Sequence, residues 1–362
     1  MPELLITGFP GFLGSALLPR LLTRRPGDRA LCLVQDRHLA RARERLEELE
    51  AEHPDLGGRV DLLTGDITRP GLGVAADHRD VLDQVVEVWH LAAVYDLAVA
   101  PEVAWRVNVD GTARVLELCR SLPNLGRLQY VSTCYVSGRY AGEFTEDALD
   151  VGQEFRNHYE ETKFEAELLV RKAMADGLPA TIYRPGIVVG DSRTGETQKY
   201  DGPYFLATFL RRQLGVALVP RVASLDAVTM SVVPRDFVVD AMDELSVLDR
   251  SLGRTYALTD PAPPTIRQLV TTFARHLGRR VVWLPLPLGI SRSAMGVPGM
   301  ERLLGLPAEA LDYLASPTTY STAHTTEDLA GTGLACPRFD EYAPRLLDFM
   351  AEHPEIDAKA MV

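Results

Sequence analysis

The sequence predicts an α/β protein built on a doubly wound parallel β-sheet with helices on both faces, followed by a smaller α-rich C-terminal lobe. Three observations predict this fold class. Short apolar runs alternate with longer helical patterns over roughly the first 195 residues, and prolines and glycines become frequent beyond that point. The apolar runs lack a polar face, which is typical of strands buried on both sides in a parallel sheet.

Six strands are expected in the first part of the chain. Their ranges are 3–8, 30–35, 59–66, 85–93, 127–133 and 179–190. The expected helices are 15–24, 39–50, 104–121 and 159–176, where apolar residues recur at helical spacing. Strand–helix units return near 230–277, at 230–248 and at 255–277. We therefore divide the chain into a sheet domain at 1–195, to which these returns are added, and a lobe made mainly of 196–362.

Composition and charge exclude several classes of protein. Hydrophobic residues make up 46% and charged residues 24% of the chain, and its formal net charge is -12. These values predict a folded globular protein and argue against nonspecific binding to nucleic acid. No stretch reaches the roughly 18 to 20 apolar residues that a membrane-spanning helix needs. We therefore expect no stable membrane span and a cytoplasmic protein, and a homodimer is left open.

The cysteines give no sign of a metal site or a disulfide. They are Cys32, Cys119, Cys134 and Cys336, and they form no CxxC pair and lie near no histidine at metal-ligand spacing. Free thiols in a reducing compartment are the expected state, with a disulfide or a zinc site as the alternative.

A glycine-rich turn follows the first expected strand and opens the first expected helix. Gly8, Gly11 and Gly14 recur every three residues. Gly8 would allow a tight turn, Gly11 a close approach of the backbone to a pyrophosphate, and Gly14 close packing of helix on strand. The helix N-terminus would then offer unpaired N–H groups to phosphate oxygens. The pattern predicts a Rossmann-type dinucleotide site, with a tight turn that binds nothing as the alternative.

A tyrosine and a lysine share one face of an expected helix. Tyr159 and Lys163 stand four residues apart, and Thr133 ends the expected strand that precedes them. A nearby ammonium favours the phenolate, so we expect it to lower the pKa of Tyr159 from its ordinary value of about 10. The three side chains could then give a proton and a hydrogen bond to a carbonyl oxygen. A solvated helical pair is the alternative.

Taken in order, these and other segments resemble the extended short-chain dehydrogenases/reductases over about residues 1–260. The segments are TGFPGFLG (7–14), GDI (65–67), HLAA (90–93), NVDGT (108–112), YVSTCYVSG (130–138), YEETK (159–163) and YRPG (183–186). The resemblance implies that 1–195 binds the dinucleotide and that 196–362 mainly binds the substrate. It also implies a catalytic role for Thr133, Tyr159, Lys163 and Asn108, with Asn108 steadying a water chain behind the lysine. Together with Arg37, the expected cofactor contacts are Gly8, Phe9, Gly11, Phe12, Leu13, Gly14, Asp66, Ile67, Leu91, Ala92, Ala93, Tyr159, Lys163, Pro185, Gly186 and Ile187.

Two segments, 65–74 and 188–197, are most similar to the thioester reductase and fatty acyl-CoA reductase branch, the male-sterility-like proteins. This similarity implies an NAD(P)H-dependent oxidoreductase that reduces an acyl thioester, as acyl-CoA or bound to a carrier, to an aldehyde or alcohol. NADP(H) is the favoured cofactor and NAD(H) the alternative. The branch usually has an arginine where Gln35 stands, and Arg37 would compensate for it near the 2′-phosphate.

Other activities of the same family stay open at this point. They are those of a β-keto or hydroxysteroid-like reductase and of a nucleotide-sugar epimerase or dehydratase. A non-catalytic protein is the alternative from another class. Members of that kind usually lack the tyrosine or the lysine, so the presence of both favours an enzyme.

Several further polar residues are interpreted as structural. His90 ends a buried strand and is expected to be a packed core histidine, while His158 is expected in a loop. Strand alternation predicts that Cys134 points into the core. Asp191 and Asp201 have no partner at metal-ligand spacing.

The substrate is expected between the carboxyl edge of the sheet and the lobe, as in other open α/β folds. Candidate lining residues are Tyr95, 136–139 and 201–205. The segment 283–306 is rich in leucine, methionine and proline. It would form an apolar cover over an acyl chain or, alternatively, the core of the lobe itself.

Overall fold

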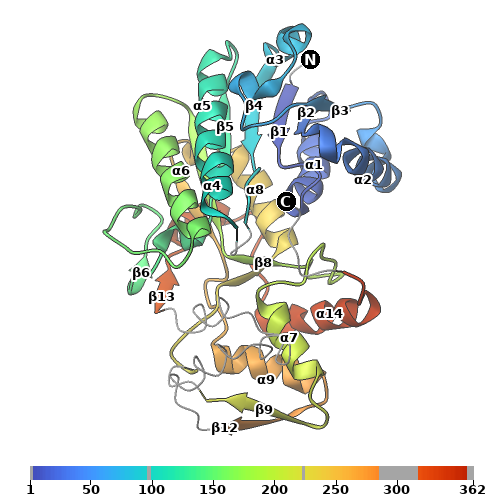
Figure 1. Ribbon diagram of the computed structural model, residues 1–362, viewed down its shortest axis with the longest axis vertical. Coiled ribbons are helices and arrows are strands. Elements are labelled where there is room, and N and C mark those ends of the chain that lie inside the picture. The colour runs from blue at the N-terminus through green and yellow to red at the C-terminus, as the bar shows by residue number, and fades with distance from the viewer. Residues whose placement is uncertain (1–2, 96–98, 222–224, 285–316, 357–362) are drawn as a thin grey trace.

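The computed structural model describes residues 3–95, 99–221, 225–284 and 317–356. Its centre is a seven-stranded sheet whose strand pairs are all parallel. In spatial order the strands are β3 (Val60–Thr64), β2 (Arg29–Val34), β1 (Glu3–Thr7), β4 (Val85–His90), β5 (Arg127–Val131), β7 (Ala180–Pro185) and β11 (Thr255–Leu258). The strand order reverses between β1 and β4, which is the point where open α/β sheets bind ligands. The predicted doubly wound parallel sheet is confirmed (Figure 1).

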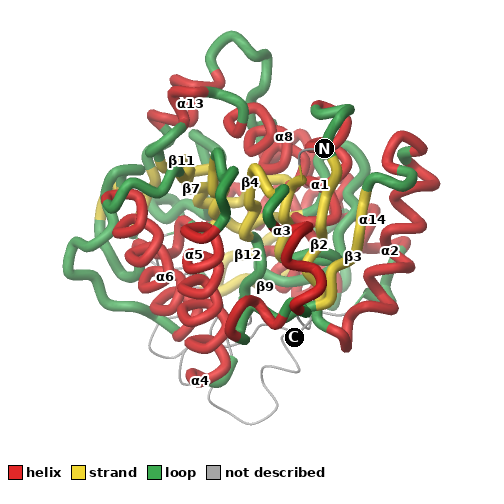
Figure 2. Tube along the Cα trace, turned by 90° about the horizontal axis from the view of Figure 1, so that it is seen from above, coloured by secondary structure: helices red, strands yellow, loops and turns green. Residues whose placement is uncertain are grey.

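Helices cover both faces of the sheet (Figure 2). On one face, α1 (Phe12–Arg24), α2 (Leu39–Glu52) and α8 (Arg235–Ser246) pack on β1 and β2 in one hydrophobic cluster. On the other face, α3 (Arg79–Leu82), α5 (Gly111–Ser121) and α6 (His158–Ala175) pack in a second cluster. Leu4 and Ile6 of β1 belong to the first cluster and Leu5 to the second, because successive side chains of a strand point to opposite faces.

A lobe, visible below the sheet in Figure 1, begins with the segment that follows β7 in the chain. Here β8 (Ile187–Val189) pairs with β10 (Val232–Pro234). The lobe contains α7 (Pro203–Arg211), β9 (Val216–Pro220), α9 (Ile266–His276), β12 (Arg280–Leu284) and α14 (Phe339–Glu352) around its own hydrophobic cluster. The parallel pairing of β9 with β12 adds a small sheet to a lobe for which the sequence predicts mainly helices.

Three expected elements differ from the structure. The single strand expected at 179–190 is two strands in different sheets, broken at Gly186. A Cβ on Gly186 would lie 2.3 Å from the carbonyl oxygen of Ser231, so the segment bends where another backbone crosses it. The helix expected at 104–121 consists of α4 (Pro101–Ala104), a π-helix (Trp105–Asp110) and α5. Of the unit at 255–277, β11 joins the main sheet while α9 packs in the lobe.

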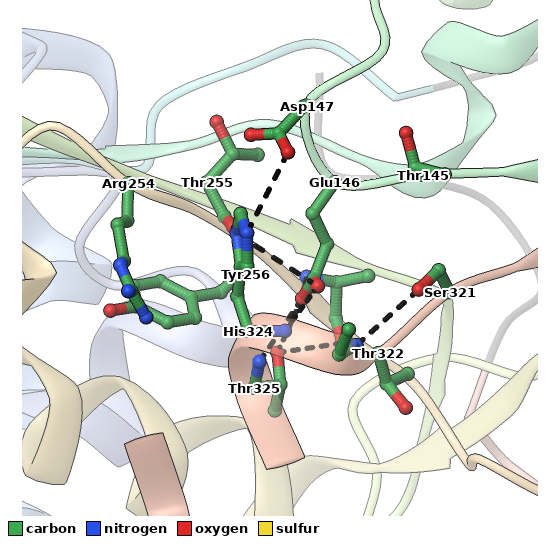
Figure 3. A network of polar contacts seen from close by, with 12 residues as sticks. Thr145, Glu146, Asp147, Arg254, Thr255, Tyr256, Ser321, Thr322, His324 and Thr325 are labelled. Atoms are coloured by element: carbon green, nitrogen blue, oxygen red, sulfur yellow. Dashed lines mark hydrogen bonds and ion pairs between the residues drawn. The ribbon is translucent and has the colours of Figure 1, made fainter. Parts of the chain in front are cut away.

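A buried carboxylate, Glu146, joins three segments at one edge of the sheet (Figure 3). It follows β6 (Gly142–Phe144), which pairs with β13 (Thr318–Tyr320). Its Oε1 accepts hydrogen bonds from Ala257 N of β11 and from the Thr325 hydroxyl, both at 2.9 Å. Its Oε2 accepts one from His324 N at 2.6 Å. Since His324 and Thr325 lie in α13 (Ala323–Leu329), the carboxylate fixes this late helix to the sheet domain.

Within the described ranges, every helix is too short or too polar to cross a bilayer.

Candidate active site

The glycine turn lies between β1 and α1, at the point where the strand order reverses. Gly8 has a φ of 94°, and a Cβ there would lie 2.8 Å from Ala92 N. A Cβ on Gly11 or Gly14 would lie 2.6 or 2.7 Å from the Gly8 carbonyl oxygen. The turn is therefore compact in itself. Gly11 is required by the protein's own backbone, whereas the sequence suggested only that it leaves room for a bound pyrophosphate. Gly11 is the N-cap of α1 and makes no side-chain cap, so first-turn N–H groups remain without an acceptor inside the helix.

The segment after β4 packs against this turn. Leu91 N donates a hydrogen bond to Thr7 O, and Ala92 N donates one to the Thr7 hydroxyl, both at 3.2 Å. Leu91, Ala92 and Ala93 are all half-buried. The structure thus places this expected contact segment beside Gly8.

Asp66, Gln35 and Arg37 lie together beyond the carboxyl ends of β2 and β3. The Arg37 Nε donates a hydrogen bond to Gln35 Oε1 at 2.8 Å. Burial would raise the pKa of Asp66, but hydrogen bonds from Thr68 and Gln35 outweigh it and hold that pKa below its ordinary value. Ile67 follows and packs against Gly111, where a Cβ would lie 2.8 Å from its Cδ1.

Thr133 and Tyr159 meet beyond the end of β5. Thr133 is buried and caps a short 3₁₀ helix (Cys134–Ser137) by accepting a hydrogen bond from Tyr135 N at 3.3 Å. Tyr159 lies in the first turn of α6, which Asn157 caps by accepting from Glu160 N at 3.0 Å. Burial raises the pKa of Tyr159 to about 12, although its hydrogen bond with Thr133 acts in the opposite direction. The expected lowering of this pKa is therefore not found, because burial disfavours the phenolate.

Lys163 lies one helical turn beyond Tyr159 and is 3% exposed. Its Nζ donates hydrogen bonds to Val131 O at 2.8 Å and to the Tyr130 hydroxyl at 3.1 Å. The ammonium also lies 4.7 Å from the centre of the Tyr130 ring. Burial lowers the pKa of Lys163 to about 8, and the carboxylate of Glu167 opposes this shift.

Asn108 lies in the π-helix and is buried. Its Nδ2 donates hydrogen bonds to Val94 O and to the Thr162 hydroxyl, both at 3.0 Å, and its Oδ1 accepts one from Val94 N at 2.9 Å. The side chain therefore clamps the segment after β4 to α6, beside Lys163. Its part in a water chain remains a prediction, since these contacts are all with protein.

Pro185 contacts Thr133, and Gly186 and Ile187 follow it in the chain. The Thr133 hydroxyl donates to Pro185 O at 3.4 Å. Gly186 N donates to Leu258 O at 3.1 Å, so this segment is held at the sheet edge.

The remaining polar candidates have structural partners. His158 pairs with Glu161 on the exposed start of α6, so it begins a helix where a loop was expected. Cys134 is buried as expected, but it lies in a 3₁₀ turn beyond the strand. Its thiol donates a hydrogen bond to Arg184 O at 3.0 Å, and burial raises the pKa of this thiol. Asp201 pairs with Lys199 at 2.7 Å. No group of metal ligands was found among the described residues.

A buried polar chain behind Lys163 was not predicted from the sequence. His90 Nδ1 contacts the Thr7 hydroxyl at 2.8 Å, and its Nε2 contacts the Thr112 hydroxyl at 3.0 Å. Thr112 in turn lies beside the Tyr130 hydroxyl. Burial lowers the pKa of His90 to about 3, so it is the neutral core histidine that was expected. The sequence signal that could have indicated this chain is the presence of polar residues within otherwise apolar, buried strands and helices.

The expected substrate side is described in part. Tyr95 is 38% exposed, and the Lys199 ammonium lies 4.6 Å from its ring centre. The segment 201–205 leads into α7, which packs in the lobe core. Of the expected apolar cover at 283–306, residues 285–306 lie outside the described residues.

Comparisons with known proteins agree with this geometry. The family model described as male sterility protein matches residues 6–242. Glycine betaine reductase ATRR of Emericella nidulans is 31% identical over 281 residues, which cover 73% of this chain and 21% of that protein. A linear gramicidin synthase of Brevibacillus parabrevis is 28% identical, over 71% of this chain and 5% of that protein. Fatty acyl-CoA reductase wat of Drosophila melanogaster is 28% identical, over 55% of this chain and 45% of that protein. The chain thus spans less than half the length of these relatives.

A solved structure is similar over nearly the whole chain. The terminal R domain from the myxalamid PKS-NRPS biosynthetic pathway has a TM-score of 0.82 at 28% identity, covering 99% of this chain and 93% of that one. A thiolation-reductase di-domain from an archaeal non-ribosomal peptide synthetase has a TM-score of 0.78 at 21% identity, covering 98% of this chain and 76% of that one. Since the family model matches well over half of the chain, the protein belongs to the male sterility protein family, a group of NAD(P)-dependent reductases of the extended short-chain dehydrogenase/reductase type.

Proposed function

We propose that this protein is an NADP(H)-dependent reductase that converts an acyl thioester, presented as acyl-CoA or on a carrier, to an aldehyde or an alcohol. The observation that carries the proposal is the cluster of Thr133, Tyr159 and Lys163 at the carboxyl edge of the sheet, with Thr133 beside Tyr159. The names of two relatives, a fatty acyl-CoA reductase and an R domain of a PKS-NRPS pathway, support the substrate class.

The residues present fit a dinucleotide. The uncapped N-terminus of α1 offers N–H groups suited to phosphate oxygens, and the absence of side chains at Gly8, Gly11 and Gly14 keeps the turn compact. When bound, NADPH supplies the hydride for the reaction.

The protein's own groups manage the carbonyl oxygen. Hydride addition to the carbonyl carbon of a thioester places negative charge on that oxygen. Thr133 would donate a hydrogen bond to it, and Tyr159 would transfer its proton, giving a hemithioacetal. A pKa of Tyr159 of about 12 keeps the phenol protonated near neutral pH and ready to act as an acid. The hemithioacetal then collapses to aldehyde and thiol, and a second reduction would give the alcohol.

Lys163 would hold the nicotinamide ribose hydroxyls and favour the phenolate that proton transfer leaves on Tyr159. With a pKa of about 8, Lys163 is mostly in its charged ammonium form at neutral pH. Asn108 would keep α6 and the segment after β4 in register through its bonds to Thr162 and Val94.

The preference for NADP(H) is supported by the end of β2. Gln35 places an amide there, without a negative charge to repel a 2′-phosphate, and it accepts a hydrogen bond from Arg37 at 2.8 Å. Arg37→Ala should raise the KM for NADPH about tenfold and leave the KM for NADH nearly unchanged, as expected for one guanidinium–phosphate contact. Arg43→Ala, an exposed arginine of α2, is the control. Equal effects on both cofactors would contradict the preference.

The reaction is tested by following NADPH absorbance with octanoyl-CoA, octanal and a ketone, and by analysing the products. Consumption with the thioester or the aldehyde, and its loss by a factor of at least 100 in Tyr159→Phe, is expected. Turnover of the ketone alone would reject the substrate class, and a Tyr159→Phe variant with near-normal activity would reject the assigned acid.

We further propose that the protein works in the cytoplasm. Cys32, Cys119, Cys134 and Cys336 are all free thiols, a state that suits a reducing compartment.

A further inference from the structure

The buried chain behind Lys163 assigns one more residue to the proposed site, and this inference rests on the proposed function. Lys163 donates two hydrogen bonds, one to the Val131 carbonyl and one to the Tyr130 hydroxyl. Tyr130 is fully buried and Lys163 nearly so. Water therefore has little access to the ammonium, and the two protein acceptors decide where it points.

The Tyr130 hydroxyl is itself held in place. It lies beside Thr112, whose hydroxyl donates its one proton to Asn108 O at 2.6 Å. The Thr112 oxygen must therefore accept from its other hydrogen-bond partner, His90 Nε2, at 3.0 Å. It follows that His90 carries its proton on Nε2 and accepts at Nδ1 from the Thr7 hydroxyl at 2.8 Å.

The far end of the chain is the turn expected to bind the cofactor. The Thr7 oxygen accepts from Ala92 N at 3.2 Å, and the backbone at Ala92 touches Gly8. We propose that Tyr130 is a positioning residue for Lys163, and that Thr112 and His90 fix the orientation of its hydroxyl. A chain of buried polar contacts thus joins the catalytic ammonium to the glycine turn.

The ionisable groups around the ammonium give this contact a measurable effect. The Glu167 carboxylate, one turn further along α6, favours the charged lysine. Burial raises the pKa values of Tyr130 and Tyr159, so both phenols are neutral near pH 7, and His90 is neutral as well. The Tyr130 hydroxyl is therefore a neutral acceptor that opposes the effect of burial. Its removal should make the ammonium form of Lys163 less favourable.

The test compares two buried tyrosines that each lose a hydroxyl. Tyr130→Phe keeps the ring under the ammonium but removes the acceptor. Tyr183→Phe, on the neighbouring strand, removes a hydroxyl that donates to Gln129 Oε1 at 2.8 Å and serves as the matched control. The readouts are kcat and KM with octanal and NADPH, measured from pH 6 to 10. For loss of one charge-assisted hydrogen bond, kcat should fall about tenfold and the alkaline limb of its pH profile should move down by about one unit.

The KM for octanal should change by less than about twofold, because Tyr130 contacts the lysine and not the substrate. Tyr183→Phe should keep the wild-type pH profile. A second pair acts one link further along the chain. Thr112→Val should move the limb in the same direction, and Thr112→Ser, which restores a hydroxyl, should return it toward the wild-type position. This pair decides the matter if Tyr130→Phe does not fold.

The outcomes separate the inference from the function on which it rests. An inactive wild-type protein, or an active Tyr159→Phe variant, would overturn the proposed function. An active wild type with an inactive Tyr159→Phe would leave the function standing. In that case, pH profiles of Tyr130→Phe and Thr112→Val that coincide with the wild type would overturn only the positioning role of Tyr130.

Discussion

Replacing Glu167 by glutamine removes the charge at the centre of a buried ion cluster while nearly preserving the size of the side chain. Glu167 and Arg184 are 0% and 1% exposed, and Arg184 Nη2 lies 2.6 Å from Glu167 Oε1. The Ser132 hydroxyl donates to Oε2 at 2.6 Å, and Arg171 Nε lies 3.0 Å from Oε1. Burial alone would raise the pKa of Glu167, but the charge of Arg184 outweighs it and holds that pKa below its ordinary value.

The size of the expected loss of stability depends on which contacts Arg184 keeps and which it loses in this variant. Its guanidinium keeps hydrogen bonds to Ala148 O at 2.7 Å and to Thr145 O at 3.3 Å, but it loses the carboxylate that balances its charge. Removing one partner of a buried ion pair costs about 3 to 5 kcal/mol. Because the carbonyl contacts persist and the amide still offers one oxygen, we expect the lower end, about 3 kcal/mol.

Urea unfolding at pH 7.5 measures this loss. With an m-value of about 3 kcal/mol/M, the midpoint should fall by about 1 M without a change in m. Glu161→Gln, at an exposed position of the same helix, should stay within about 0.5 kcal/mol of the wild type.

The folded-state pKa of Glu167 lies below the unfolded value of about 4.3. The stabilisation is therefore complete above that pH and disappears as the pH falls through the folded-state pKa. A loss below about 1 kcal/mol at pH 7.5 would refute the reasoning.

Three further predictions concern the turn, the lysine and the asparagine. Gly14→Ala should weaken NADPH binding, measured by fluorescence titration, by at least about tenfold, because its Cβ would lie 2.7 Å from a backbone oxygen; Gly27→Ala, with open space around it, should bind normally. The value of kcat/KM should decline as the pH rises through about 8, where Lys163 loses its proton, and a flat profile up to pH 10 would contradict the assigned role. Asn108→Ala should cost about 2 kcal/mol in urea unfolding and lower kcat, since Val94 and Thr162 lose their shared partner. As the control, Asn124→Ala removes an exposed hydrogen bond to Asp83 O and should cost less than about 0.5 kcal/mol. Equal losses for the two asparagine variants would argue against the role of Asn108 in holding Val94 and Thr162 together.

The sequence predicts most of what depends on local spacing. The glycines of the turn, and the tyrosine and lysine one helical turn apart, are patterns within a few residues. The catalytic roles of Thr133, Tyr159 and Lys163 stay predictions. The parallel sheet was equally predictable, because its strands are short apolar runs separated by helices.

What the sequence could not predict depends on contacts between distant segments. The break at Gly186 exists because the backbone at Ser231 crosses there. The π-helix around Asn108 lies where this side chain contacts both Val94 and Thr162. These contacts are with distant segments, so local helix propensity could not predict the π-helix. The raised pKa of Tyr159 follows from burial by the assembled fold, which the lysine four residues away could not reveal.

The bonds of Glu146 determine where this chain can be cut. A fragment that ends at residue 195, the boundary suggested by composition, would lack Ala257, His324 and Thr325, the donors that satisfy this carboxylate. It would also lack β11, the strand at one border of the sheet. The sheet domain is thus completed by residues beyond 195 that lie between segments of the lobe in sequence, and expression of residues 1–195 alone should yield an insoluble or unfolded product.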